Sequence, residues 1–122
     1  MNLTKLDTVF SQFIRRKYAD DRGLVQCYTC GQWMHWKSAD CGHYLKRGNL
    51  ATRFSEMNCR PQCKDCNQFK DGKVDIFRKK LLQEYGAYAL LELEHESKNE
   101  IHLMQFEIDE LVEVYKDKIK KL

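Results

Sequence analysis

Two cysteine pairs are the residues whose types and spacing point most directly to a chemistry. The members of each pair are separated by two residues, and 32 residues, numbered 31 to 62, lie between the pairs. Four thiolates in two such turns are typical of a closed tetrahedral site for structural Zn²⁺. In a chain of this size, the ion would contribute much of the folding free energy. The predicted zinc ligands are Cys27, Cys30, Cys63 and Cys66.

A second set of reactive side chains lies between the pairs and directly after them. Asp40 and His43 are three positions apart, and Asn67 follows the last cysteine. A neutral imidazole can take a proton from water near pH 7, and carboxylate and carboxamide oxygens are ligands that Mg²⁺ accepts. These residue types suit metal-assisted hydrolysis of a phosphodiester, in which a cation stabilises the leaving oxygen. The zinc site would hold Asn67, at the start of a helix, beside the strand that carries Asp40 and His43.

The order of these residues resembles a nuclease motif. The motif residues, in chain order, are Asp40-x-x-His43, Asn58 and Cys63-x-x-Cys66-Asn67. This order is similar to that of the ββα-metal nucleases of the HNH and endonuclease VII type. The sequence resembles the phage Rap (NinG) recombination nucleases more closely, over roughly residues 25–95. The segments that carry this closer resemblance are 41–47, 52–54, 58–67, 85–86 and 90–93.

The resemblance implies a role for each motif residue. His43 is the general base, Asn58 braces a loop through backbone hydrogen bonds, and Asp40 and Asn67 hold a catalytic Mg²⁺ or Mn²⁺. The common HNH pattern has histidine where Asn67 stands, whereas the endonuclease VII branch has asparagine, a neutral and weaker ligand. The implied fold is α+β, a small zinc-stabilised ββα-metal nuclease core with a flanking N-terminal helix and C-terminal helices.

The implied activity is a DNA endonuclease that acts on branched recombination intermediates, such as Holliday junctions and D-loops. Its products carry 5′-phosphate and 3′-hydroxyl ends. Two alternatives stay open: an HNH endonuclease acting on linear duplex DNA in restriction or packaging, and a non-catalytic zinc module that binds DNA or a partner protein. The first alternative uses the same catalytic residues, so only a comparison of cleavage of junction and linear DNA separates it from junction cleavage.

The net charge of +3 is distributed unevenly along the chain. Residues 1–36 carry a net charge of +2, residues 37–80 carry +6, and residues 81–122 carry −5. The basic middle segment favours a polyanionic partner, whereas the acidic C-terminal third favours packing or assembly. Basic side chains in this segment either contact DNA phosphates or brace the loop between two strands. The predicted DNA-binding residues are Lys46, Arg47, Arg53 and Arg60.

Membrane and secreted classes do not fit this sequence. No apolar run approaches the roughly 20 residues that span a bilayer, and the first residues lack the pattern of a signal peptide. Six cysteines without such a signal favour metal ligands over disulfides. By the phage resemblance, we expect a phage- or prophage-encoded protein in the cytoplasm of a bacterial host.

Hydrophobic periodicity and turn residues predict the elements that position these side chains. Strands are predicted within 37–45 and 58–62, and helices over 3–18, from 63, over 74–85 and over 87–97. Residues 100–122 carry apolar residues at seven-residue spacing, which predicts packing onto the chain's own core or a homodimer through the C-terminal helices. The predicted divisions are an N-terminal helix and turn (1–24), the nuclease core (25–85) and a C-terminal helical region (86–122).

The remaining aromatic, histidine and cysteine residues are predicted to be structural. Trp33 and Trp36 are expected in the core, His35 is expected to be half-buried, and Cys41 and Cys59 are expected to be small buried residues. Cys41 is the one of these that could alter the choice of zinc ligands.

Overall fold

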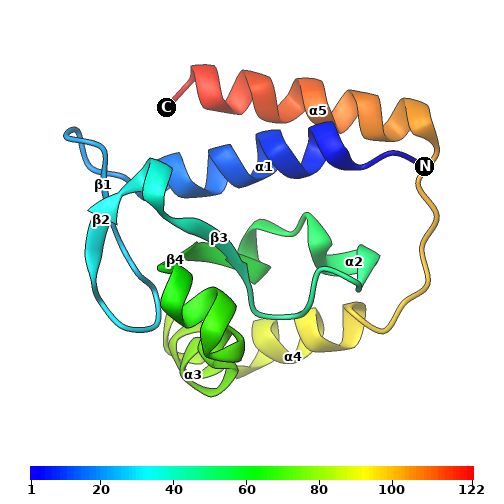
Figure 1. Ribbon diagram of the computed structural model, residues 1–122. Coiled ribbons are helices and arrows are strands. Elements are labelled where there is room, and N and C mark those ends of the chain that lie inside the picture. The colour runs from blue at the N-terminus through cyan, green and yellow to red at the C-terminus, as the bar shows by residue number, and fades with distance from the viewer.

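The computed structural model describes residues 1–122 and shows helices packed around two short pairs of antiparallel strands (Figure 1). The helices are α1 (Thr4–Lys17), α2 (Leu50–Arg53), α3 (Val74–Tyr85), α4 (Ala87–Glu96) and α5 (Gln105–Lys120). The strands are β1 (Leu24–Gln26), β2 (Trp33–His35), β3 (Asp40–His43) and β4 (Cys59–Gln62). A short π-helical segment, Asp65–Phe69, follows β4. The fold is therefore α+β, and none of its helices combines the length and apolar character needed to cross a bilayer.

Helices α1 and α5 lie side by side and form one layer of the molecule (Figure 1). Apolar residues of α1 recur every three or four positions, so they share one face. The buried residues of this layer are Leu6, Val9, Phe10, Phe13 and Ile14 of α1 and Ile108, Val112 and Tyr115 of α5. The rings of Phe10 and Tyr115 meet edge to face with centroids 5.0 Å apart.

The C-terminal apolar stripe thus packs onto the chain's own core, which confirms the first of the two interpretations of its spacing. Helix α1 covers the buried part of the stripe. Three other residues at this seven-residue spacing, Ile101, Met104 and Leu122, are exposed.

Strands β3 and β4 pair antiparallel, with Asp40 opposite Gln62 and His43 opposite Cys59. Strand β3 is shorter than the predicted segment 37–45, because residues 36–38 form a 3₁₀ turn. Gly42 allows a close approach between the strands: a Cβ there would lie 1.9 Å from Oε1 of Gln62. The Gln62 amide can then donate to Thr29 Oγ1 at 3.0 Å and to the Gly72 carbonyl at 2.8 Å.

The other side of the β3–β4 pair is covered by α3 and α4 through a second apolar cluster. Its buried members are Tyr44, Phe77, Leu81, Leu90 and Leu93. Gly86, with a φ of 85°, separates the two helices, as its position after the apolar pattern of 74–85 predicted.

The β1–β2 hairpin lies at the surface and buries Val25. Trp33 and His35, on β2, point outward and are exposed, so the prediction of core and half-buried positions for them is wrong. Two cysteines lie in the loop of this hairpin.

Candidate functional site

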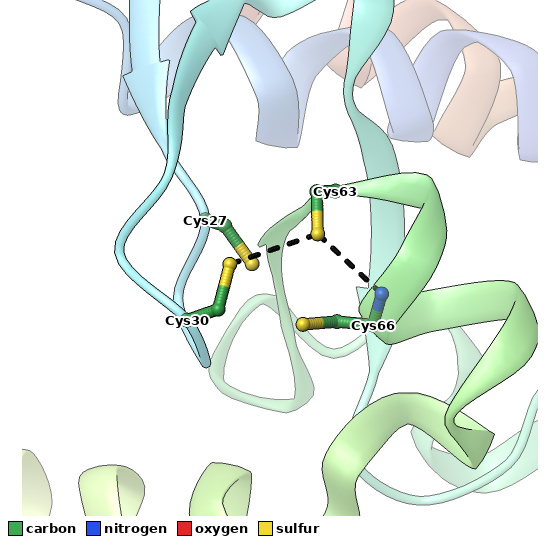
Figure 2. Close-up of side chains that lie close together, drawn as sticks. All are labelled: Cys27, Cys30, Cys63 and Cys66. Carbon is green, nitrogen blue, oxygen red and sulfur yellow. Dashed lines mark hydrogen bonds between the residues drawn. The ribbon is translucent and has the colours of Figure 1, made fainter.

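Four cysteine side chains converge between the β1–β2 loop and the turn that follows β4 (Figure 2). Their sulfur atoms all lie within 4.8 Å of one another, and Sγ of Cys30 is 3.7 Å from Sγ of Cys63. The backbone N–H of Cys66 donates to Sγ of Cys63 at 3.4 Å. Gly31, with a φ of 81°, lets the first turn close directly after Cys30. We call Cys27, Cys30, Cys63 and Cys66 the four-cysteine site.

The electrostatics of the four-cysteine site favour a bound cation. Burial would raise the pKa of the Cys27 thiol, but the backbone N–H groups around it and the Thr29 hydroxyl lower that pKa to about 6. Burial raises the pKa of Cys66 to about 12. Four thiolates this close would repel one another, so a divalent cation is needed for all four to ionise. The all-sulfur donor set fits a structural metal such as zinc.

Asp40, His43 and Asn67 line one cleft of about 790 Å³ beside the four-cysteine site. The Asn67 side chain donates to Oδ2 of Asp40 at 2.9 Å, although 27 residues separate them. Gln68 donates to the same oxygen at 2.8 Å, and the Lys64 ammonium lies 2.7 Å from Oδ1. Burial would raise the pKa of Asp40, but these three donors outweigh it and hold that pKa below 3.8. Asp40 is therefore an ionised carboxylate that already attracts a cation.

His43 lies on β3, and its ring is held in place by a contact with the loop that joins β3 to β4. Its Nε2 is 2.9 Å from the Arg53 carbonyl, which can only accept a hydrogen bond. Nε2 must therefore carry a proton, and in the neutral ring Nδ1 is the atom that can accept one. Burial lowers the pKa of His43 below 6.5; the backbone hydrogen bonds with Arg53 and Cys41 oppose this shift, and the charges of Arg47 and Arg53 add to it. The neutral ring is the dominant form at pH 7.

Asn58 is fully buried and ties both ends of this loop together. Its Oδ1 accepts from the Leu45 N–H at 2.8 Å, and its Nδ2 donates to the carbonyls of Leu45 at 2.9 Å and Thr52 at 3.2 Å. The backbone partners are those of a loop brace, as the motif resemblance implied for this residue.

Replacing Asn58 with alanine is expected to lower the free energy of unfolding by at least about 2 kcal/mol. The reason is that three backbone groups, two on half-buried Leu45 and one on buried Thr52, lose their partner, and each unsatisfied buried group costs about 1–3 kcal/mol. Urea unfolding measures the change, with Asn49→Ala as a matched control at an exposed residue of the same loop whose side chain makes no capping bond. Equal stability of the two variants would contradict the bracing role.

The basic side chains predicted to bind DNA fall into different environments. Lys46 is exposed at the cleft. Arg53 forms a two-point ion pair with Asp7 of α1. Its Nε lies 3.0 Å from Oδ1 of Asp7, and its Nη2 lies 2.6 Å from Oδ2. Arg47 also reaches Asp7, at 3.0 Å, but keeps over half of its side chain exposed. Arg53 therefore braces the loop, whereas Lys46 and Arg47 remain accessible to a phosphate.

Arg60 is a correction to the predicted DNA-binding set. It is only 1% exposed, and its guanidinium lies over the rings of Tyr18, Tyr28 and Tyr85, with centroid distances of 4.9 to 5.4 Å. It also pairs with Glu84 at 3.0 Å. A cation enclosed in this way stabilises the fold and does not reach DNA.

Several cleft residues were missed by the sequence reasoning. Asp7 comes from α1, Lys37 precedes β3, and Gln68 follows Asn67. The position of Gln68 next to a motif residue was a usable signal. For Asp7 there was none, because its partners Arg47 and Arg53 lie 40 and 46 residues away.

Fold and site together define a small α+β protein with a four-cysteine site that could hold a structural metal such as zinc. The chain matches the family model described as "Bacteriophage Lambda NinG protein" over residues 3–122. The chain therefore belongs to the NinG family, which confirms that part of the resemblance seen in its motifs.

The relatives are phage proteins. The chain is 36% identical to "Protein ninG" of Salmonella phage P22 over 92 residues, which cover 70% of the chain and 40% of that protein. It is 36% identical to "Protein ninG" of Escherichia phage lambda over 88 residues, covering 67% and 38%. The chain spans about two fifths of the length of these relatives. The comparison with solved structures gave no match.

Proposed function

We propose that this chain is a metal-dependent DNA endonuclease of the ββα-metal type that cleaves branched recombination intermediates. The observation that carries the proposal is the shared cleft of Asp40, His43 and Asn67, three residues of the nuclease motif. The cleft is also lined by basic side chains that suit a phosphate backbone. These cations are Arg15, Lys37, Lys46, Arg47 and Lys64.

His43 serves as the general base in this proposal. The Arg53 carbonyl fixes the proton on Nε2, so Nδ1 takes the proton from the attacking water. The buried environment keeps the ring neutral at pH 7, so the base is ready without a prior deprotonation. Asn58 and the Asp7–Arg53 pair hold the loop whose carbonyl orients the ring.

Asp40 and Asn67 are the residues that would hold Mg²⁺ or Mn²⁺. Their donor types fit such a hard cation: Asp40 is ionised, and Asn67 lies beside it. The Asn67 Nδ2 now donates to Asp40, so the amide would turn over to present its carboxamide oxygen to the cation. When bound, the cation supplies Lewis-acid stabilisation of the leaving oxygen. Lys64, now paired with Asp40, is exposed and free to turn toward a phosphate.

DNA is the proposed partner, and the resemblance to recombination nucleases selects branched DNA. Action in the cytoplasm of a bacterial host belongs to the same proposal. A homodimer that nicks two strands would use the exposed apolar residues of the C-terminal region, Met104, Phe106 and Val114, because α1 covers the buried stripe.

The proposal is tested by incubating end-labelled DNA with the zinc-loaded protein and Mg²⁺ or Mn²⁺. A four-way junction and a linear duplex of the same sequence are compared. We expect cation-dependent cleavage of the junction that is faster than cleavage of the duplex and leaves 5′-phosphate ends. Equal rates would favour the linear-duplex alternative. Binding of both substrates without cleavage would favour the non-catalytic zinc module.

A further inference from the structure

A second group of sulfur and nitrogen donors lies outside the four-cysteine site. Cys41 and His43 are two positions apart on β3, so their side chains share one face of the strand. Cys59 is directly opposite His43 on β4 and faces the same way. Their ligand atoms, two sulfurs and one ring nitrogen, all lie within 4.8 Å of one another. We call Cys41, His43 and Cys59 the cysteine–histidine cluster.

The cysteine–histidine cluster reaches from the core to the cleft. Cys59 is fully buried in the apolar cluster that contains α1 and α5, and Cys41 packs against that cluster from its edge. Cys41 and His43 are half-buried and line the cleft. The Cys59 thiol makes a long hydrogen bond of 3.9 Å to the Arg53 carbonyl. An ion that enters from the cleft therefore meets Cys41 and His43 first and the buried Cys59 thiol behind them.

The cluster is separate from the four-cysteine site. Cys59 begins β4, whereas Cys63 directly follows the last residue of that strand, so the two groups lie at opposite ends of it. The other donors of the cysteine–histidine cluster come from β3, whereas the other donors of the four-cysteine site come from the β1–β2 loop and the turn after β4.

We propose that the cysteine–histidine cluster is a second binding site, for a thiophilic divalent cation such as Zn²⁺. Two thiolates and one imidazole are a donor set that Zn²⁺ takes readily, with water from the cleft in the fourth position. On binding, both thiols lose their protons to solvent. Mg²⁺ prefers oxygen ligands and does not compete for this site.

Occupation of the cluster has a consequence that rests on the proposed function. His43 cannot accept a proton from water while its nitrogen is bound to a metal ion. A thiophilic cation therefore inhibits cleavage by removing the general base, while the ligands of the catalytic cation, Asp40 and Asn67, stay in place.

Binding is tested without any activity assay. The full chain, carrying zinc in the four-cysteine site and kept reduced by a phosphine that excludes disulfides, is titrated with Co²⁺. We expect one Co²⁺ per chain beyond the zinc, with the visible bands of tetrahedral Co²⁺ and a thiolate charge-transfer band. Absence of a thiolate-bound Co²⁺ in this protein would overturn the proposal.

The variant Cys41→Ala tests whether the additional Co²⁺ is bound by the cysteine–histidine cluster. Removal of a residue that merely supports a ligand costs about 10–100-fold in affinity, so loss of a direct ligand should weaken Co²⁺ binding at least that much. His102→Ala removes an exposed histidine from the acidic third and should bind Co²⁺ as the unaltered chain does. Unchanged Co²⁺ affinity in a folded Cys41→Ala protein would overturn the assignment.

An activity assay then tests inhibition. Added Zn²⁺ should inhibit Mg²⁺-dependent cleavage by the unaltered chain, and Cys41→Ala should require at least a tenfold higher Zn²⁺ concentration for the same inhibition. Equal sensitivity of the two proteins would overturn the inhibitory role. If neither protein cleaves DNA under any condition, the proposed function fails, whereas the Co²⁺ titration still decides whether the second site exists.

Discussion

The substitution His43→Ala is expected to lower the rate of Mg²⁺-dependent junction cleavage by about 10²–10⁴-fold, the usual contribution of a general base. Binding of the junction should change little, because His43 makes its hydrogen bond within the chain, to the Arg53 carbonyl. Single-turnover cleavage and a gel-shift titration separate the two effects. The control is His102→Ala, which should cleave at the unaltered rate. Cleavage by His43→Ala at that rate would remove His43 from the mechanism.

The pH profile gives a second measure of the same group. The pKa of His43 is lowered from 6.5, and the protonated ring cannot act as a base. The cleavage rate should therefore be constant around pH 7 and fall as pH decreases through a value below 6.5. In His43→Ala this acid limb should disappear from the residual rate. A limb centred well above 6.5 in the unaltered chain would point to another titrating group.

Loss of a ligand from the four-cysteine site is expected to have the largest effect on stability. Structural Zn²⁺ contributes about 10–16 kcal/mol of apparent binding free energy in zinc-finger peptides, which is as large as the whole stability of a typical domain, about 5–15 kcal/mol. Cys63→Ser should therefore leave the chain largely unfolded at 25 °C, as should removal of the ion by a chelator. Circular dichroism and a colorimetric zinc assay measure the two quantities together.

The matched control is Cys41→Ser, a cysteine of the same chain outside the four-cysteine site. It should stay folded and retain one tightly bound zinc per chain. Removal of Mg²⁺, in contrast, should stop cleavage and leave the circular dichroism spectrum unchanged. A folded and zinc-free Cys63→Ser protein would show that the ion is not structural.

Features encoded by residues close together in the chain could be predicted from the sequence, whereas features that depend on contacts between distant residues could not. The four-cysteine site was predictable because each pair forms one local turn with a fixed ligand spacing. The bracing contacts of Asn58 followed from the motif resemblance. The environments of Arg47, Arg53 and Arg60 did not, because burial depends on which element covers a side chain. Arg60 is enclosed by tyrosines from three other segments, 25 to 42 residues away along the chain.

Strands β3 and β4 also combine a feature that the local sequence encodes with one that depends on distant residues. Alternation along a strand places Cys41 and His43 on one face, and this could be read from the sequence. The register that brings Cys59 opposite His43 could not, because it depends on the length and bracing of the loop between β3 and β4. The contribution of Asp7 to that loop depends on how α1 lies across the strands, which no local pattern specifies.

The packing of α1 against α5 determines when this protein can fold during its synthesis. Phe10 and Tyr115 are 105 residues apart in the chain, yet their rings are in contact. At about 5–20 residues per second, the ribosome needs about 5–20 s to make the helix that covers α1 after α1 has been made. Throughout that interval the face of the nascent α1 that packs against α5 is open to chaperones.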